Sequence, residues 1–350
     1  MGASRISMEI RRLNTLRAMA ALMVLAGHYS NHSKLWDAIL GQRAPQLGVM
    51  LFFLLSSFLM SVLYMHRDPT PKTLKNYAWA RAGRVLPLFV LVVLGSYALV
   101  KLPIPWISES VYQIPDLKSL VSHVLLLYGV QVLWTIPTEI HFYFIFGLLW
   151  WLRPRAPWVI AAFCAVILVV FSSGHWPLGP KQPFMGFPID LPLLRGLPYF
   201  VVGMSLGILY HRWKSPHQSH WFVAALGLVF LLYPAILERL AGWTYDMWFN
   251  PLILLVMGLV FFCVVFLVPQ GNRLLENRAG DFLGKISYSL YLLHFPILLV
   301  LGKWGLVHGV SGLLLFLAIS IVAATASFHF FEAPMRRRIR ALGATKPTVT

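Results

Sequence analysis

The sequence contains a series of long apolar stretches, and these limit its possible folds more than any other feature. Several of them exceed the ~18–20 residues that a helix needs to cross the hydrocarbon core of a bilayer. The composition agrees, because 58% of the residues are hydrophobic and only 12% are charged, about half the charged share of a soluble domain. Mean hydropathy is +0.71. The sequence therefore predicts a polytopic membrane protein built from helices.

We expect an all-α bundle of about ten transmembrane helices. The expected spans are residues 13–30, 46–65, 85–101, 135–152, 157–173, 194–211, 220–237, 250–268, 286–302 and 310–331. Segment 119–133 is apolar but shorter, and we expect an outer-face or re-entrant element there. Residues 1–340 are expected to form a single transmembrane domain, followed by a disordered cytoplasmic tail over residues 341–350.

The positions of the basic residues predict an orientation. The net charge is +17, from 29 Lys and Arg against 12 Asp and Glu. These charges lie in short loops between apolar runs, which argues for a topology signal and against a nucleic-acid surface. With the N-terminus inside, 21 basic residues fall in inner segments, and the eight in outer segments are Lys34, Arg43, Lys101, Lys118, Lys181, Arg195, Arg239 and Lys303. Both termini are therefore predicted to be cytoplasmic, at the cell membrane.

Ionisable side chains within spans are costly and are therefore functional candidates. Arg17 and His28 are eleven residues apart in the first expected span, almost three turns, so both face the same side of a helix. Arg17 would lie near the inner surface and His28 deep toward the outer half. The alternatives are an arginine that extends to the interface and a histidine that only supports packing.

Glu139 is the one acidic residue expected well inside a span. It lies about a turn and a half into a helix that enters from the outer side. His28 reaches a similar depth from the other direction, so the carboxylate could orient and stabilise the imidazole. The alternative is a protonated glutamate that only fixes helix packing.

Arg81 and Arg84 are i,i+3 neighbours at the inner start of the third expected span. They share a helix face and could bind phosphate oxygens, or could simply be part of the positive-inside pattern. His28 and His32 have a spacing compatible with two metal ligands, but no third ligand is evident. We therefore predict no metal site.

Taken together, these features resemble the acyltransferase 3 family of membrane O-acyltransferases. The resemblance covers nearly the whole chain and rests on separated motifs that occur in the family's order: Arg17 to His28 (Arg-x10-His), Leu51–Met60 (Phe-Phe-x-x-Ser-Gly-Phe-Leu), Arg81–Pro87 (Arg-x-x-Arg-x-x-Pro), Trp134–Tyr143 (Trp-Ser/Thr-x-x-x-Glu-x-x-Phe-Tyr), Gly284–Ile297 and Glu332–Pro334. The clearest departure is Ser57, which stands where the family usually has glycine.

The resemblance implies transfer of an acyl group, of the acetyl type, from cytoplasmic acyl-coenzyme A to a hydroxyl. The acceptor is usually a carbohydrate at the outer face. Arg17, Arg81 and Arg84 would bind the phosphates of the coenzyme. His28 would act as general base on the acceptor hydroxyl, with Glu139 orienting it or serving the outer substrate.

A shared substrate cavity is expected to be lined by five further residues: Ser57, Tyr143, Tyr288, Tyr291 and His294. The expected partners are acyl-coenzyme A, a glycan or other hydroxyl-bearing acceptor and the lipid bilayer, without nucleic acid. Direct attack of the hydroxyl is the simplest route, and an acyl-histidine intermediate is the alternative. The residues do not distinguish acetyl from succinyl or longer groups, nor lipopolysaccharide from exopolysaccharide, a lipo-oligosaccharide or a macrolide as acceptor.

A transporter is the main competing interpretation, because transporters also place ionisable groups near the bilayer midplane. Transporters commonly contain duplicated halves, which this sequence does not show. A purely structural membrane protein would leave Arg17, His28 and Glu139 without a reason.

Overall fold

A computed structural model describes residues 2–40, 43–177, 187–188, 190, 192–213, 217–232, 234–242 and 246–343. Within these ranges the chain forms helices and no β-strand, as the sequence predicts. The elements are α1 (Gly2–Ser33), α2 (Asp37–Leu40), α3 (Ala44–Tyr64), α4 (Pro71–Val100), α5 (Pro105–Ser108), α6 (Leu117–Val124), η1 (Gln131–Trp134), α7 (Thr135–Leu152), α8 (Trp158–Ser172), α9 (Leu193–Tyr210), η2 (His220–Ala224), α10 (Ala225–Leu231), α11 (Pro234–Ala241), η3 (Met247–Phe249), α12 (Pro251–Phe262), η4 (Cys263–Leu267), α13 (Arg278–Lys303), α14 (Gly309–Ser327), η5 (Phe328–Glu332) and α15 (Ala333–Gly343).

Within the described part of the chain, six helical segments are long and apolar enough to cross a membrane. They are Ala44–Tyr64, Pro71–Val100, Gln131–Leu152, Leu193–Tyr210, Arg278–Lys303 and Gly309–Gly343. Each covers one of the expected spans to within one residue. The chain is therefore confirmed as all-helical with membrane-spanning character, whereas the count of ten and the orientation stay predictions.

The other four expected spans also fall on helices, but on less apolar or shorter ones. Helix α1 is 32 residues long, and its charged and polar residues reduce its hydropathy. Helices α8 and α12–η4 form shorter apolar segments, and the expected span 220–237 is divided among η2, α10 and α11. The expected tail begins inside α15, and its last seven residues lie outside the described part of the chain.

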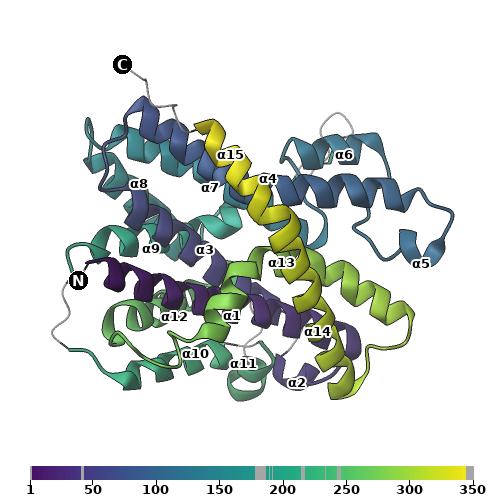
Figure 1. The fold of residues 1–350 in the computed structure, drawn as a ribbon. Helices are drawn as coiled ribbons and strands as arrows, with labels where there is room; N and C mark the ends of the chain where they lie inside the picture. The colour runs from purple at the N-terminus through teal and green to yellow at the C-terminus, as the bar shows by residue number, and fades with distance from the viewer. Residues whose placement is uncertain are drawn as a thin grey trace.

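Segment 119–133 does not contain a spanning helix. Helix α6 is only eight residues long, about 12 Å, and η1 leads directly into α7. Figure 1 shows α5 and α6 beside the C-terminal half of α4, away from α1. This agrees with the expectation of a peripheral element.

Helix α1 is central, because it packs against both α3 and α13 (Figure 1). Glycines at these crossings allow the backbones to approach, as small residues do in membrane helix pairs. A Cβ added to Gly48 on α3 would lie 2.4 Å from the carbonyl oxygen of Ala20, and one added to Gly284 on α13 would lie 2.1 Å from that of Asn14. Gly203 on α9 would similarly meet the carbonyl of Leu54 on α3, at 2.3 Å. Close helix contact thus holds the four inner helices together.

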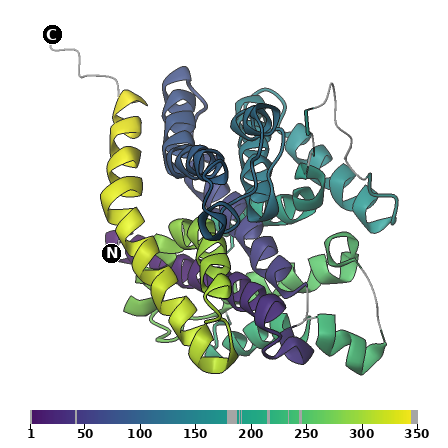
Figure 2. The same cartoon turned by 90° about the vertical axis from the view of Figure 1, so that its right-hand side faces the viewer.

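Helices α14, η5 and α15 continue one another and lie along one side of the molecule (Figure 2). Helix α15 crosses α4, where a Cβ on Gly83 would meet Ile339 at 3.0 Å. The middle of this run, η5, is a π-helix. Such widened turns are rare and are frequent at functional sites.

The second π-helix, η4, is held by a buried arginine. The guanidinium of Arg12 donates to the carbonyl oxygens of Val264, Val268 and Pro269 at 3.2, 2.9 and 2.8 Å. It also pairs with Glu276 at 2.6 Å, and both side chains are almost completely buried. Arg12 therefore satisfies the carbonyls that a helix end leaves without partners.

Candidate active site

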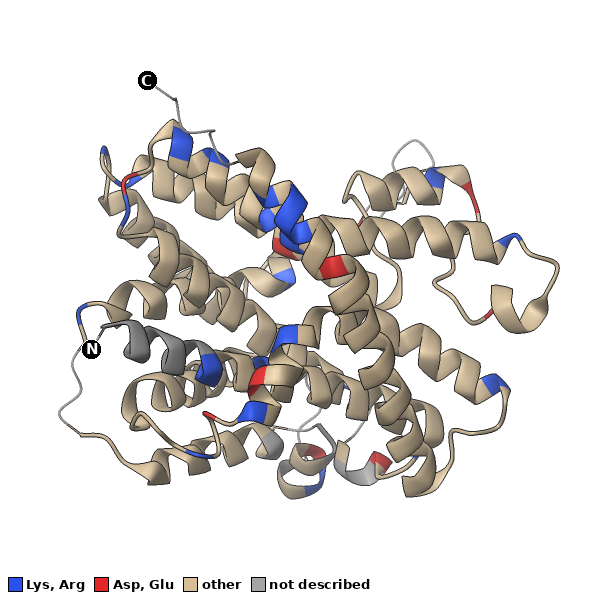
Figure 3. Ribbon diagram, in the orientation of Figure 1, with Lys and Arg blue, Asp and Glu red and all other residues tan. Residues whose placement is uncertain are grey.

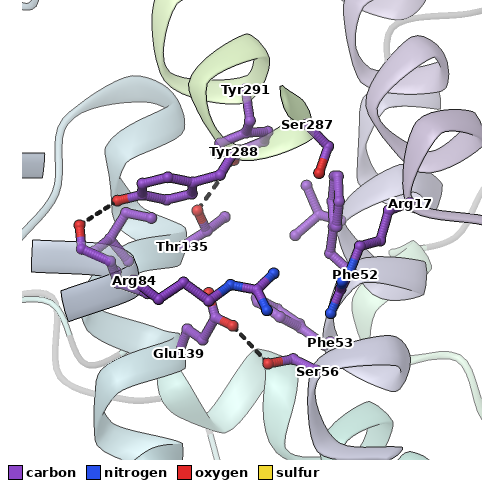
Figure 4. Close-up of a pocket in the computed structure, with 13 residues that line it drawn as sticks. Arg17, Phe52, Phe53, Ser56, Arg84, Thr135, Glu139, Ser287, Tyr288 and Tyr291 are labelled. Carbon is purple, nitrogen blue, oxygen red and sulfur yellow. Dashed lines mark hydrogen bonds between the residues drawn. The ribbon is translucent and has the colours of Figure 1, made fainter. Parts of the chain in front are cut away.

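A cavity of about 580 Å³ lies where α1, α3, α4, α7 and α13 meet. Its walls combine charged, hydroxyl-bearing and aromatic side chains (Figure 4). They are Arg17, Val49, Phe52, Phe53, Ser56, Arg84, Val85, Thr135, Ile136, Glu139, Ser287, Tyr288 and Tyr291. A concave pocket with a few convergent polar groups is the usual form of a small-molecule site.

Two guanidinium groups point into this cavity from different walls. Figure 4 shows Arg17 reaching in from α1 and Arg84 from α4. Arg17 makes one long hydrogen bond, 3.4 Å, to Asn14. Among the described residues Arg84 donates no hydrogen bond and forms no ion pair. The cavity therefore contains donors that are free to bind an anionic group.

Glu139 provides the carboxylate of the cavity. Its Oε1 accepts hydrogen bonds from the hydroxyls of Ser56 on α3 and Tyr143 on α7, both at 2.5 Å. The Ser56 contact joins two helices that are 83 residues apart in the sequence. Glu139 is also within electrostatic range of Arg17. The carboxylate is thus held in one position at the foot of the cavity.

The tyrosines of α13 form the opposite wall. Tyr288 donates to the carbonyl oxygen of Val85 at 2.5 Å, and Tyr291 donates to that of Val132 at 3.0 Å. Thr135 donates to the Tyr291 hydroxyl at 3.2 Å. These bonds hold both rings against the cavity.

His28 does not line the cavity and makes no hydrogen bond with Glu139. Its ring instead lies 5.3 Å from the ring of His294 and 5.5 Å from that of Phe295, between centroids. His294 in turn is 5.9 Å from Tyr291, which is a wall residue. The expected direct pairing of Glu139 with His28 is therefore not present, because each packs in a different group.

His294 is fully buried and, contrary to the expectation, is not among the residues that line the cavity. Its Nδ1 donates to the carbonyl oxygen of Tyr291 at 2.7 Å, which leaves Nε2 as the nitrogen without a hydrogen. That Nε2 has no hydrogen-bond partner in the described structure. The pair His28–His294 thus forms a second polar group behind Tyr291.

Three expected site residues lie behind the cavity wall. Ser57 is completely buried and donates to the carbonyl of Phe53 at 3.0 Å, while its neighbour Ser56 takes the cavity position. Arg81 lies over the rings of Tyr64 and Tyr143, 5.9 Å from each centroid. Tyr143 reaches the site only through Glu139. The reason is the helical rotation of about 100° per residue, which turns adjacent residues to different neighbours.

The sequence analysis missed several wall residues: Phe52, Ser56, Thr135 and Ser287. Each of the four lies within one of the sequence motifs. A motif does not show which face of its helix lines a cavity, because that depends on which neighbouring helix covers the opposite face. Among the described residues, no three His, Cys, Asp or Glu side chains are grouped so that they could hold a metal ion.

Comparison with known proteins identifies the family. The model of an acyltransferase domain, acyltransferase 3, matches residues 10–331. A Staphylococcus aureus protein to which O-acetyltransferase activity is ascribed is 23% identical over 94% of this chain, and the chain spans 58% of that protein's length. No solved structure matches.

Two further relatives are covered almost completely. A protein of Acidianus two-tailed virus, described as an acetyltransferase, is 26% identical over 95% of this chain and 93% of its own length. The exopolysaccharide production protein ExoZ of Rhizobium meliloti is 26% identical over 85% of this chain and 92% of its own length. The matched family domain covers all the elements that build the cavity, so this chain belongs to the acyltransferase 3 family.

Proposed function

We propose that the protein is a membrane O-acyltransferase that moves an acyl group, of the acetyl type, from cytoplasmic acyl-coenzyme A to a hydroxyl of a carbohydrate or glycoconjugate at the outer face. The observation that carries this proposal is the cavity in which the free guanidinium of Arg84 and that of Arg17 meet the fixed carboxylate of Glu139. The acetyltransferase descriptions of relatives support the acetyl group, and the name of ExoZ supports a polysaccharide acceptor.

Arg17 and Arg84 bind the anionic part of the donor, because planar guanidinium groups pair well with phosphate oxygens. Arg81 supports this site indirectly, through Tyr143 and Glu139. The acyl arm occupies the less polar part of the cavity, between Phe52, Thr135 and Tyr291. Its thioester carbonyl then points toward the wall behind which His28 and His294 lie.

The acceptor hydroxyl approaches from the outer side and attacks the thioester carbonyl carbon. A new C–O bond forms, the C–S bond breaks, and coenzyme A leaves as the thiolate. His28 removes the proton of the attacking hydroxyl, and His294 packs against its ring. Glu139 acts from the cavity, where it holds Ser56, Tyr143 and the nearby Arg17 in place. The proposed topology has ten spans with both termini in the cytoplasm.

The proposed function is tested by acetyl transfer from labelled acetyl-coenzyme A to cell-surface glycan in membranes that contain the protein. We expect transfer by the wild type and a loss of about 10²–10⁴-fold in His28→Ala, which is the usual contribution of a general base. His32→Ala is the matched control, because His32 is an exposed histidine one turn further along α1.

Two outcomes would contradict the proposal in different ways. If the His28→Ala protein is expressed normally and transfers acetyl groups as fast as the wild type, His28 is not the general base. Protein-dependent uptake of a solute without any acylated product would instead support a transporter.

A further inference from the structure

A second, more polar cavity of about 410 Å³ adjoins the first. The two cavities share a wall, because four residues line both of them: Arg17, Arg84, Ser287 and Tyr288. The far side of the second cavity is formed by the C-terminal part of the chain, through Glu332 and Arg336. None of these C-terminal residues belongs to the donor site as proposed above.

The charge of the second cavity is strongly positive. Arg17, Arg84, Lys285 and Arg336 line it, against the single carboxylate of Glu332. Figure 3 shows basic positions of α15 gathered where this helix crosses α4. Because a concave, low-dielectric wall focuses the field of such charges, the cavity attracts anions.

The hydrogen bonds of these residues show which cations remain free. Lys285 is already paired with Asp281 at 2.6 Å. Glu332 accepts from Ser289 at 2.8 Å. Arg336 forms no hydrogen bond or ion pair within the described chain, and its guanidinium lies 5.9 Å from the ring centroid of Phe328. Arg84 and Arg336 therefore offer unused donors to the same cavity from two neighbouring helices, α4 and α15.

The local structure explains why Arg336 reaches this position. The π-helix η5 widens the turn that carries Phe328 and Glu332. Gly83 lets α15 lie close to α4, since a Cβ there would be 3.5 Å from the carbonyl oxygen of Arg336. Gly284 likewise brings α13 onto α1 beside Asn14. The cavity is thus built by two close helix contacts and the widened turn of η5.

We propose that this second cavity binds the phosphorylated nucleotide end of the acyl-coenzyme A donor, and that Arg336 is a phosphate ligand there together with Arg84 and Arg17. The inference rests on the proposed function. It matches the two ends of the donor to two adjoining cavities, with the phosphates in the cationic one and the acyl arm in the more apolar one. It also gives Arg336 the direct contact that the sequence assigned to Arg81, whose guanidinium packs on tyrosine rings instead.

The test compares Arg336→Gln with wild type using three donors: acetyl-coenzyme A, acetyl-dephospho-coenzyme A, which lacks the 3′-phosphate, and acetyl-pantetheine, which lacks all phosphates. We expect Arg336→Gln to raise KM for acetyl-coenzyme A by about 10–100-fold with kcat little changed. The reason is that the variant loses one charge-assisted hydrogen bond, which is made equally in the bound donor and in the transition state. KM for acetyl-pantetheine should not change. Arg336→Lys should restore part of the affinity, and Arg337→Gln, an exposed neighbour on α15, should behave as wild type.

Three results would overturn the inference. The first is an unchanged KM for acetyl-coenzyme A in Arg336→Gln, and the second is an equal rise in KM for acetyl-pantetheine. The third is a defect that appears in nanodiscs of anionic phosphatidylglycerol but not in those of phosphatidylcholine, which would assign Arg336 to the binding of lipid headgroups. In each case the wild type still transfers acetyl groups. The absence of transfer by the wild type from any donor would instead contradict the proposed function itself.

Discussion

At the scale of single residues, Ser56 and Ser57 have opposite roles although they are adjacent. Ser56 lines the cavity and donates to Glu139, whereas Ser57 is buried against α9 and donates to the backbone of its own helix. A Cβ added to Gly203 on α9 would lie only 2.2 Å from the Ser57 hydroxyl. The two serines therefore form a natural pair of test and control.

We expect Ser56→Ala to reduce acetyl transfer by about 10–100-fold, because it removes one hydrogen bond to a charged group, worth ~1.5–3 kcal/mol. Ser57→Ala should retain wild-type activity. The measurement is initial-rate transfer at matched protein levels. A larger loss in Ser57→Ala than in Ser56→Ala would contradict the assigned helix face.

Arg12 and Arg11 form a second pair, this time for stability. Arg12→Met leaves Glu276 buried without its ion-pair partner and frees four carbonyls of the η4 region, that of Val265 included, so we expect a loss of about 3–5 kcal/mol. Arg11 is exposed, and Arg11→Gln should stay within about 0.5 kcal/mol of wild type. Thermal unfolding of the purified protein in detergent measures both. Equal stability of the two variants would show that the buried network contributes nothing.

At the scale of elements, the glycines at helix crossings decide how closely the cavity walls approach. Gly284→Ala should push α13 from α1, because its Cβ would meet backbone atoms of Asn14. We expect a loss of about 1–3 kcal/mol, typical of overpacking, together with weaker donor binding. Gly95→Ala on α4 is the control, since no atom lies within 4 Å of its added Cβ. Unfolding curves and KM for the donor provide the comparison, and two identical variants would refute the close-contact argument.

The turn after α6 depends on a buried neutral histidine. His123 Nδ1 donates to the carbonyl of Ser119 at 2.7 Å, and its Nε2 accepts the Val130 N–H at 3.1 Å. Burial lowers the pKa of His123 below its ordinary value of 6.5. Because the folded pKa is the lower one, this stabilisation is complete above about pH 6.5 and is lost as the pH falls through the folded pKa.

Hydrogen exchange of the Val130 amide, corrected for the intrinsic pH dependence, should therefore accelerate as the pH falls from 7.5 to 5. In His123→Gln the protection should be weaker and should no longer depend on pH over this range. Constant protection in the wild type would show that the imidazole is not the group that holds this turn.

At the scale of the whole molecule, two adjoining cavities with different polarity give the protein a direction. The cationic cavity is formed by α1, α4, α13, η5 and α15, and Tyr291, on the wall of the first cavity, has its ring 5.9 Å from that of His294. An acyl donor bound with its phosphates in the first would present its thioester in the second. Transfer would then require donor on one side of the membrane and acceptor on the other.

Sealed vesicles of opposite orientation test this direction. With membrane-impermeant acetyl-coenzyme A outside, only inside-out vesicles present the cytoplasmic face to the donor. They should therefore transfer acetyl groups at least about tenfold faster than right-side-out vesicles, which corresponds to ~1.4 kcal/mol in the effective barrier. Detergent should make the two preparations equal. Faster transfer in right-side-out vesicles would reverse the proposed topology.

The amino-acid sequence was enough to predict the all-helical membrane class, the family and five of the thirteen residues that line the cavity. Apolar length settles the class, because it depends only on the residues within one segment. The spacing of Arg17, Arg84, Glu139, Tyr288 and Tyr291 placed them in motifs, and all five line the cavity. Local periodicity does not bring together residues of different helices, so it was the resemblance to the family that implied a shared site for them.

Only the tertiary structure decided which side chains touch. It placed Ser56 rather than Ser57 in the cavity, paired His28 with His294 rather than Glu139, and brought Arg336 next to Arg84 from 252 positions further along the chain. These outcomes depend on how closely neighbouring helices approach and on the turn that η5 adds. These contacts cannot be predicted from a single sequence, because the function of a helix face depends on which other helix packs against it.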